Sequence, residues 1–287
     1  MFIPRYWARA EKISHDYHLI RWGYSNTSEA DALAVAEQRL ARTIEGFAAK
    51  DNLSGEEYPY GVLPTREEII EEFHDETGEL HAVITRNRYG SLVLNTDRIM
   101  FIDVDLEHER FSSCTAAAAF FWRSWFTTAK KLAQERQERS LLLLHEWLLA
   151  RPAWQVRVYR TKAGLRYLVS QPALSPGSVE SEEAMRSLGC DPRYIQLCRV
   201  QRCYRARLTP KPWRCGLNRP QSIYPWHSVS AEQSMRQWET DYVVAIQEFA
   251  TCEFITVLGP TEIPTSAAQF IQVHDRLTKA DSSLPLA

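Results

Sequence analysis

Apolar residues recur at helical spacing from Ser28 to about Lys50, and this periodicity predicts an amphipathic helix. Ser28 can cap the first turn of that helix, with Asp31 placed three residues further along as in a capping box. After a loop rich in glycine and proline, Thr65 offers a second cap, so a short acidic helix is predicted over residues 66–74. The period then changes to that of strands, in three short runs at 81–86, 91–95 and 99–105.

The second half of the chain alternates helical and strand patterns. A helical region is predicted from about 113 to 150, and a hairpin follows it, with a turn at 162–164 between two alternating runs. A further helix is predicted to begin at Asp191 and Pro192, because Asp is a favoured N-cap and Pro a favoured first helical residue. The remaining pattern predicts a strand over 202–208, a helix over 230–250 and a strand over 252–258.

This order of elements predicts an α+β fold with a largely antiparallel sheet and helices packed on it. No stretch inside 81–258 resembles a linker, so we expect one core there, after a helical extension at 1–80 and before a poorly ordered tail at 259–287. The first residues lack the apolar stretch of a signal peptide, and no apolar run approaches the ~20 residues of a membrane span. We therefore expect a cytoplasmic protein that does not enter a membrane.

The formal net charge of −2 hides two segments of opposite sign. Residues 51–80 carry ten acidic residues and one basic residue, whereas residues 190–220 carry eight basic residues and one acidic residue. The total excludes a uniformly basic protein that coats nucleic acid, but it leaves a local basic face open. The six cysteines contain no CxxC pair, so we expect small buried side chains rather than a zinc site or a disulfide framework.

The candidate chemistry begins where the strand at 99–105 ends. Alternation places Asp103, Asp105 and Glu107 on one face of this strand, behind a strongly apolar run. Neighbouring carboxylates repel each other unless a cation lies between them, so the pattern predicts a site for Mg²⁺ or Mn²⁺. Asp191 is a candidate further ligand, although its position before a proline equally suits a helix cap. An exposed strand edge with solvated acids is the alternative interpretation.

A basic turn follows in the predicted hairpin. Arg160, Lys162 and Arg166 surround Gly164, and guanidinium and ammonium groups in such a turn suit the phosphates of a nucleotide. An ordinary hairpin with a charged, solvated tip is the alternative.

A second basic cluster follows the predicted strand at 202–208, where tyrosine and tryptophan side chains are interleaved with bases. Cations combined with aromatic rings suit a phosphate backbone and stacked nucleobases. The alternative is that these bases pair within the molecule with the acidic segment 51–80. The residues concerned are Arg205, Arg207, Lys211 and Arg214, with Tyr204, Trp213 and Tyr224 as the aromatic neighbours.

The order of these motifs resembles that of the archaeo-eukaryotic primase superfamily, the primase-polymerases. The resemblance covers about 81–215 and implies an RRM-type core in which Asp103 and Asp105 bind the catalytic metals. It also implies that Gly164 and Arg166 occupy the position that contacts the incoming nucleotide, with Arg166 where the family has His. The sequence segments 84–90 and 205–216 also resemble sequences of an uncharacterised bacterial protein family.

Three functions are consistent with this pattern. The first is metal-dependent nucleotidyl transfer, with nucleoside triphosphates and a single-stranded nucleic acid as partners. The second is a non-catalytic nucleic-acid-binding protein with a degenerate primase-like fold, because the later strand carries basic residues where the family has its third acid. The third is a metal-dependent nuclease or phosphohydrolase. The distance between Asp103 and Arg166 in the fold bears directly on the primase resemblance.

Overall fold

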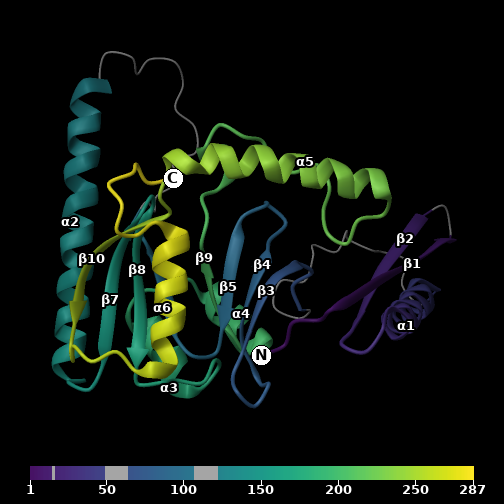
Figure 1. The fold of residues 1–287 in the computed structure, drawn as a ribbon, viewed down its shortest axis with the longest axis horizontal. Helices are drawn as coiled ribbons and strands as arrows, with labels where there is room; N and C mark the ends of the chain where they lie inside the picture. The colour runs from purple at the N-terminus through teal and green to yellow at the C-terminus, as the bar shows by residue number, and fades with distance from the viewer. Residues whose placement is uncertain (15–16, 49–63, 107–121) are drawn as a thin grey trace.

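The computed structural model describes residues 1–14, 17–48, 64–106 and 122–287 (Figure 1). The described residues form an α+β fold in which every sheet is antiparallel, as the sequence predicts. No helix in this part of the chain is both long and apolar enough to cross a lipid bilayer. The cysteines at 190, 198, 203 and 252 are buried thiols, in agreement with the expected small buried side chains.

One four-stranded sheet contains the predicted hairpin and the acidic strand. Its strand order is β10-β7-β8-β6. The hairpin is confirmed, since β7 and β8 pair directly across a short turn. Strand β6 then lies at the edge of the sheet with its acidic end beside the hairpin turn. The bounds are β6 Met100–Asp105, β7 Gln155–Thr161, β8 Gly164–Gln171 and β10 Cys252–Leu258.

A second four-stranded sheet has the order β3-β4-β5-β9. Its edge strand β9 contacts β6, the edge strand of the first sheet, so the two sheets meet along these strands. A continuous apolar core runs through both, and it contains Leu94 and Tyr204 from the second sheet beside Phe101 from the first. The bounds are β3 Glu68–His74, β4 Leu80–Arg86, β5 Leu92–Thr96 and β9 Tyr204–Arg207.

Five helices and two short 3₁₀ turns accompany these sheets in the described chain. The long helix α2 lies at one end of the molecule, and α5 crosses above the second sheet (Figure 1). The bounds are α2 Trp122–Leu149, α3 Val179–Ser187, α4 Pro192–Gln201, α5 Val229–Ala245 and α6 Thr265–Thr278, with η1 Pro212–Arg214 and η2 Ile246–Glu248.

The N-terminal residues form a small unit at the end of the molecule opposite α2 (Figure 1). A hairpin of β1 (Tyr6–Ser14) and β2 (Tyr17–Ser25) packs against α1 (Glu29–Ala48) around Leu19 and Leu40. The helix is confirmed, and the Ser28 hydroxyl accepts the predicted capping bond from the amide of residue 31 at 3.0 Å. The extension at 1–80 is therefore only partly helical, because it also contributes three strands.

Two predicted elements are wrong. Residues 68–74 form strand β3 rather than a helix, and β3 pairs with β4, so a boundary at residue 80 cuts through one sheet. The unpaired edge of β4 offers backbone partners that outweigh the local capping signal. The tail beyond 259 is also ordered, because α6 buries Phe270 and Ile271 in the main core and its Phe270 ring packs against Phe73 at 6.0 Å.

Strand pairing leaves no room for a side chain at Gly164. A Cβ atom at this position would lie 2.0 Å from the carbonyl oxygen of Val104 on the neighbouring strand β6. Backbone atoms cannot yield as the end of a flexible side chain can, so β8 and β6 must move apart to admit a methyl group.

We therefore expect Gly164→Ala to lower the free energy of unfolding by about 2 kcal/mol or more. The matched control is Gly46→Ala on α1, where a Cβ would meet no atom within 4 Å. That change should raise stability by about 0.5–1 kcal/mol, because alanine favours helix more than glycine does. Urea unfolding of both variants checks the pair. Equal effects of the two substitutions would contradict the close β8–β6 contact.

Candidate functional site

A cleft of about 680 Å³ opens where the acidic end of β6, the hairpin turn, the start of α4 and the segment after β9 meet. Its lining comes from the ends of β6, β7, β8 and β9, from the start of α4 and from the segments next to them. Most of the residues that the sequence singled out come together here. Those that line the cleft are Asp103, Asp105, Arg166, Asp191, Arg207, Lys211 and Arg214.

Three predicted nucleotide-binding residues do not line this cleft. Arg160 lies on an exposed surface, where its guanidinium pairs with Glu253 of β10 at 3.1 Å. Lys162 is exposed at the tip of the hairpin turn, and Gly164 is buried between the strands. Glu107, the third acid of the predicted metal site, lies outside the described residues.

Arg205 was predicted to contact nucleic acid, and its position in the fold contradicts this. Its side chain is buried, and it donates hydrogen bonds of 2.8 Å to both carboxylate oxygens of Glu67. A third bond of 3.0 Å reaches the hydroxyl of Thr65, the residue predicted to cap a helix. Internal pairing with the acidic segment therefore holds for Arg205, which ties the residues before β3 to β9.

Asp103 and Arg166 form an ion pair across the β6–β8 ladder. They occupy directly opposed positions in the antiparallel register, which brings their side chains to one face of the sheet. The guanidinium donates two parallel hydrogen bonds, from Nε to Oδ1 at 2.7 Å and from Nη2 to Oδ2 at 2.9 Å. Arg166 is 1% exposed, whereas the Asp103 side chain is 54% exposed toward the cleft. The carboxylate thus covers the guanidinium from the solvent side.

The charge state of this pair follows from its surroundings. Burial in the strand layer acts to raise the pKa of Asp103, but the charge of Arg166 and its hydrogen bonds outweigh burial and hold that pKa below its usual value of 3.8. Arg166 remains charged, because the attraction of Asp103 more than offsets the desolvation of its guanidinium. Both groups are therefore ionised at neutral pH.

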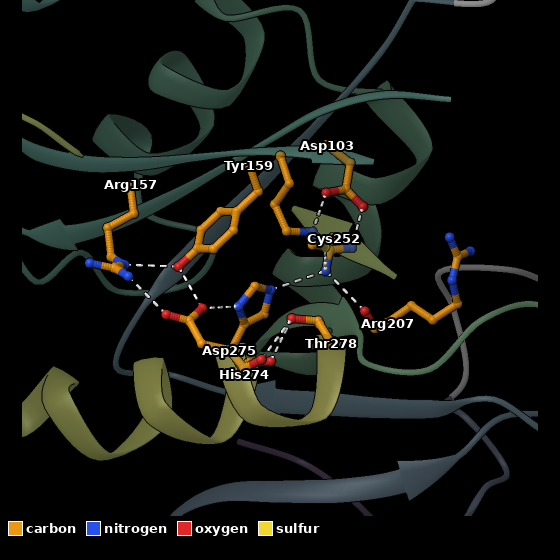
Figure 2. A network of polar contacts seen from close by, with 9 residues as sticks. Asp103, Arg157, Tyr159, Arg207, Cys252, His274, Asp275 and Thr278 are labelled. Carbon is orange, nitrogen blue, oxygen red and sulfur yellow. Dashed lines mark hydrogen bonds and ion pairs between the residues drawn. The ribbon is translucent and has the colours of Figure 1, made fainter. Parts of the chain in front are cut away.

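Behind this pair, a buried polar network connects the cleft with helix α6 (Figure 2). Arg166 donates to Nε2 of His274 at 3.3 Å, which places the imidazole proton on Nδ1, where it is shared with Asp275 at 2.9 Å. Burial lowers the pKa of His274, Asp275 opposes this effect, and the Arg166 charge lowers the pKa further. The imidazole is therefore neutral. Tyr159 and Arg157 complete the network through bonds of 2.7 and 2.8 Å to Asp275.

The network was not predicted from the sequence, because residues beyond 259 were expected to be a poorly ordered tail. The missed signal is a helical spacing of buried positions at Ala267, Phe270, Ile271 and His274. A histidine on the apolar face of an amphipathic helix, followed by an aspartate, is a recognisable indication of a buried polar contact.

Arg207 is one of the cationic side chains that line the cleft. Its backbone carbonyl accepts a bond of 2.9 Å from Arg166, while its own side chain points away from the network (Figure 2). Its Nε is buried and has no hydrogen-bond partner among the described residues. Burial and the neighbouring charges of Arg166 and Arg214 lower the pKa of Arg207, and Asp103 only partly offsets them. An anion in the cleft would relieve this repulsion.

The charges lining the cleft sum to a positive value. Three acids face five bases, because Arg193 at the start of α4 adds to the predicted cations. Among the acids, Asp103 is paired with Arg166, and Asp191 caps α4 by accepting a 2.8 Å bond from the amide of residue 193. The cap interpretation of Asp191 is thereby confirmed.

These donors do not fit the predicted pair of divalent cations. Both oxygens of Asp103 accept hydrogen bonds from a buried guanidinium, and a cation there would face that positive charge directly. Within the described residues, three ligand-type side chains converge only at Asp75, Glu79 and His81, on the β3–β4 turn, and not at the cleft. There the guanidinium of Arg98 already contacts the His81 ring at 2.8 Å.

No protein-family model, curated protein or solved structure matches this chain. The resemblance to primase-polymerases therefore stays a prediction that rests on the order of the sequence motifs.

Replacing Asp103 with Asn removes the charge that compensates the buried Arg166. We expect the free energy of unfolding at neutral pH to fall by about 3 kcal/mol, the lower end for breaking a buried pair, because Asp103 is half exposed. Since the folded-state pKa of Asp103 is depressed, the pair contributes fully above pH about 4 and is lost as the pH falls through the lower, folded-state pKa. The difference between wild type and D103N in urea unfolding should therefore shrink toward acid pH.

The control is Glu253→Gln, which removes the partner of Arg160 in an exposed pair. Exposed pairs contribute less than about 1 kcal/mol, so this variant should unfold almost like the wild type. If D103N were as stable as E253Q at neutral pH, the buried guanidinium would not depend on its carboxylate.

Proposed function

We propose that the cleft binds the phosphate groups of a nucleoside triphosphate or of a single-stranded nucleic acid, and that it does so without a catalytic metal pair. The observation that carries the proposal is the partly buried Arg207 side chain, whose Nε has no hydrogen-bond partner in the described chain and which lies among other cations. A guanidinium in this state is suited to a phosphate, with which it can form two parallel hydrogen bonds.

The size and position of the cleft support a nucleotide-sized ligand. Its volume of about 680 Å³ lies within the range of about 300–1,000 Å³ that is common for small-molecule and cofactor sites. Lys211 and Arg214 continue the cationic lining beyond Arg207, so a polyphosphate or a run of backbone phosphates would meet successive positive charges.

The state of Asp103 favours binding over catalysis. In the resemblance to primase-polymerases, this carboxylate would hold metal and Arg166 would stand in the place of a histidine. A buried arginine at that place takes up both carboxylate oxygens and adds a fixed positive charge. The second hypothesis, a nucleic-acid-binding protein with a degenerate primase-like core, is therefore the one we put forward.

Metal-dependent nucleotidyl transfer remains the second candidate, because Asp103 and Asp105 both line the cleft from β6. A single assay distinguishes the two candidate functions: labelled single-stranded DNA is incubated with Mn²⁺, with and without nucleotides. We expect the DNA strand to be bound and to keep its original length, and we expect EDTA to leave its binding unchanged. Extension of the strand would favour transfer, and its shortening would favour a nuclease.

Arg207→Met should weaken binding of single-stranded DNA about tenfold, because a hydrogen bond to a charged group is worth about 1.5–3 kcal/mol. The slope of log affinity against log salt concentration should also become less steep by about 0.7–0.9, which corresponds to one lost phosphate contact. Fluorescence anisotropy across a salt series measures both quantities. Methionine keeps the apolar stem, and removing a poorly paired charge should leave stability intact.

The matched control is Arg160→Ala, which also removes one arginine but outside the cleft. Its affinity and its salt dependence should stay close to those of the wild type. Equal losses in the two variants would mean that binding follows the overall charge and not this cleft.

A further inference from the structure

An exposed tryptophan lies at the edge of the cleft. Trp213 is 49% exposed, and it is the only exposed tryptophan among those whose side chains the structure describes. It belongs to η1, and both Arg214, the next residue, and Lys211, two residues before it, line the cleft. A large apolar ring held open to solvent next to cationic side chains indicates a binding surface more than a packing defect.

The turn that carries Trp213 is held firmly. Prolines lie on both sides of Lys211, and the amides of residues 214 and 217 close the turn with bonds of 2.9 and 3.0 Å to the carbonyls of residues 211 and 212. The carbonyl of Pro210 accepts hydrogen bonds from the buried hydroxyls of Ser91 and Tyr242. The backbone that carries the indole is thus fixed, so little backbone entropy would be lost when a ligand binds.

A second ring and two cations adjoin the indole. Tyr89, on the β4–β5 turn, packs against Trp213 with ring centres 5.6 Å apart and planes at 82°. The ammonium of Lys211 lies 5.5 Å from the indole centre, and the guanidinium of Arg88 lies 4.7 Å from the Tyr89 ring. This aromatic pair, Trp213 and Tyr89, therefore has a cation on each side.

We propose that the aromatic pair stacks a nucleobase of a single-stranded nucleic acid whose backbone continues into the cleft. The inference rests on the proposed function. Of the two ligands named there, a nucleoside triphosphate and a single-stranded nucleic acid, it selects the single-stranded nucleic acid. Combined cationic and aromatic surfaces are typical of proteins that bind single strands without sequence preference, because every base has a face to stack. An acidic polypeptide could engage the cations, but it would leave the indole exposed.

The test compares Trp213→Ala and Trp213→Phe with the wild type by fluorescence anisotropy, using two strands of about 12 nucleotides. One is oligothymidylate, and the other is an abasic strand of equal length and charge. We expect Trp213→Ala to weaken oligothymidylate binding about tenfold, because stacking on one aromatic ring contributes on this scale. Trp213→Phe should restore most of the loss. Affinity for the abasic strand should be the same in all three proteins.

The controls separate this inference from the proposed function. Inorganic pyrophosphate, as a competitor, should give the same inhibition constant with wild type and W213A, since it binds only the cleft. The stacking surface is refuted if W213A binds oligothymidylate like the wild type, or loses the abasic strand to the same extent. It is refuted also if polyglutamate binds as tightly as oligothymidylate, which would favour a protein partner. In each case the Arg207→Met result still reports on the cleft. A wild type that binds a nucleoside triphosphate but no strand refutes only this inference, and one that binds neither refutes both proposals.

Discussion

The buried guanidinium of Arg166 is the interaction on which the rest of this architecture depends. A charge that is 1% exposed is tolerated only where its hydrogen bonds are nearly all made, because desolvation of an ion is expensive and an unpaired one destabilises a fold severely. Arg166 meets this requirement with partners from several surrounding elements, among them Asp103 from β6, the Arg207 carbonyl from β9 and His274 from α6. The junction of the two sheets and the docking of the C-terminal helix are therefore tied to one side chain.

This requirement also determines the chemistry of the cleft. Two aspartates at the end of a strand would, by themselves, make an anionic site suited to a metal ion. Because Arg166 takes up the charge of Asp103, and Asp191 is engaged as a helix cap, the cations after β9 dominate the cleft. The same motif order that resembles a metal-dependent polymerase thus produces a site of the opposite electrostatic sign.

Much of the fold could be predicted from local signals, and the errors have a common physical cause. The β7–β8 hairpin and the Asp191 cap depend on residues close in sequence, and both are confirmed. Strand β3 and helix α6 depend on surfaces supplied by distant parts of the chain, and both were predicted wrongly. The same distinction divides the site. The pairing of Asp103 with Arg166 follows from the register of β6 and β8, and the order of the sequence motifs indicated only that the two residues lie near each other. His274, in contrast, comes from a segment 108 residues away from Arg166.

The contrast between Arg205 and Arg207 shows why charge counted along the sequence could not settle the question of partners. The two residues are separated by one position on β9, so alternation alone assigns them to the same face and the same role. Arg205 pairs with Glu67, the residue just before β3, whereas Arg207 lies at the end of β9 beside another guanidinium. Other acids of the acidic segment pair with bases from elsewhere, Glu68 with Arg236 and Glu72 with Arg5. Among the described residues, the two segments therefore cancel only in part, and the lining of the cleft, with five bases and three acids, has a net positive charge that favours anionic ligands.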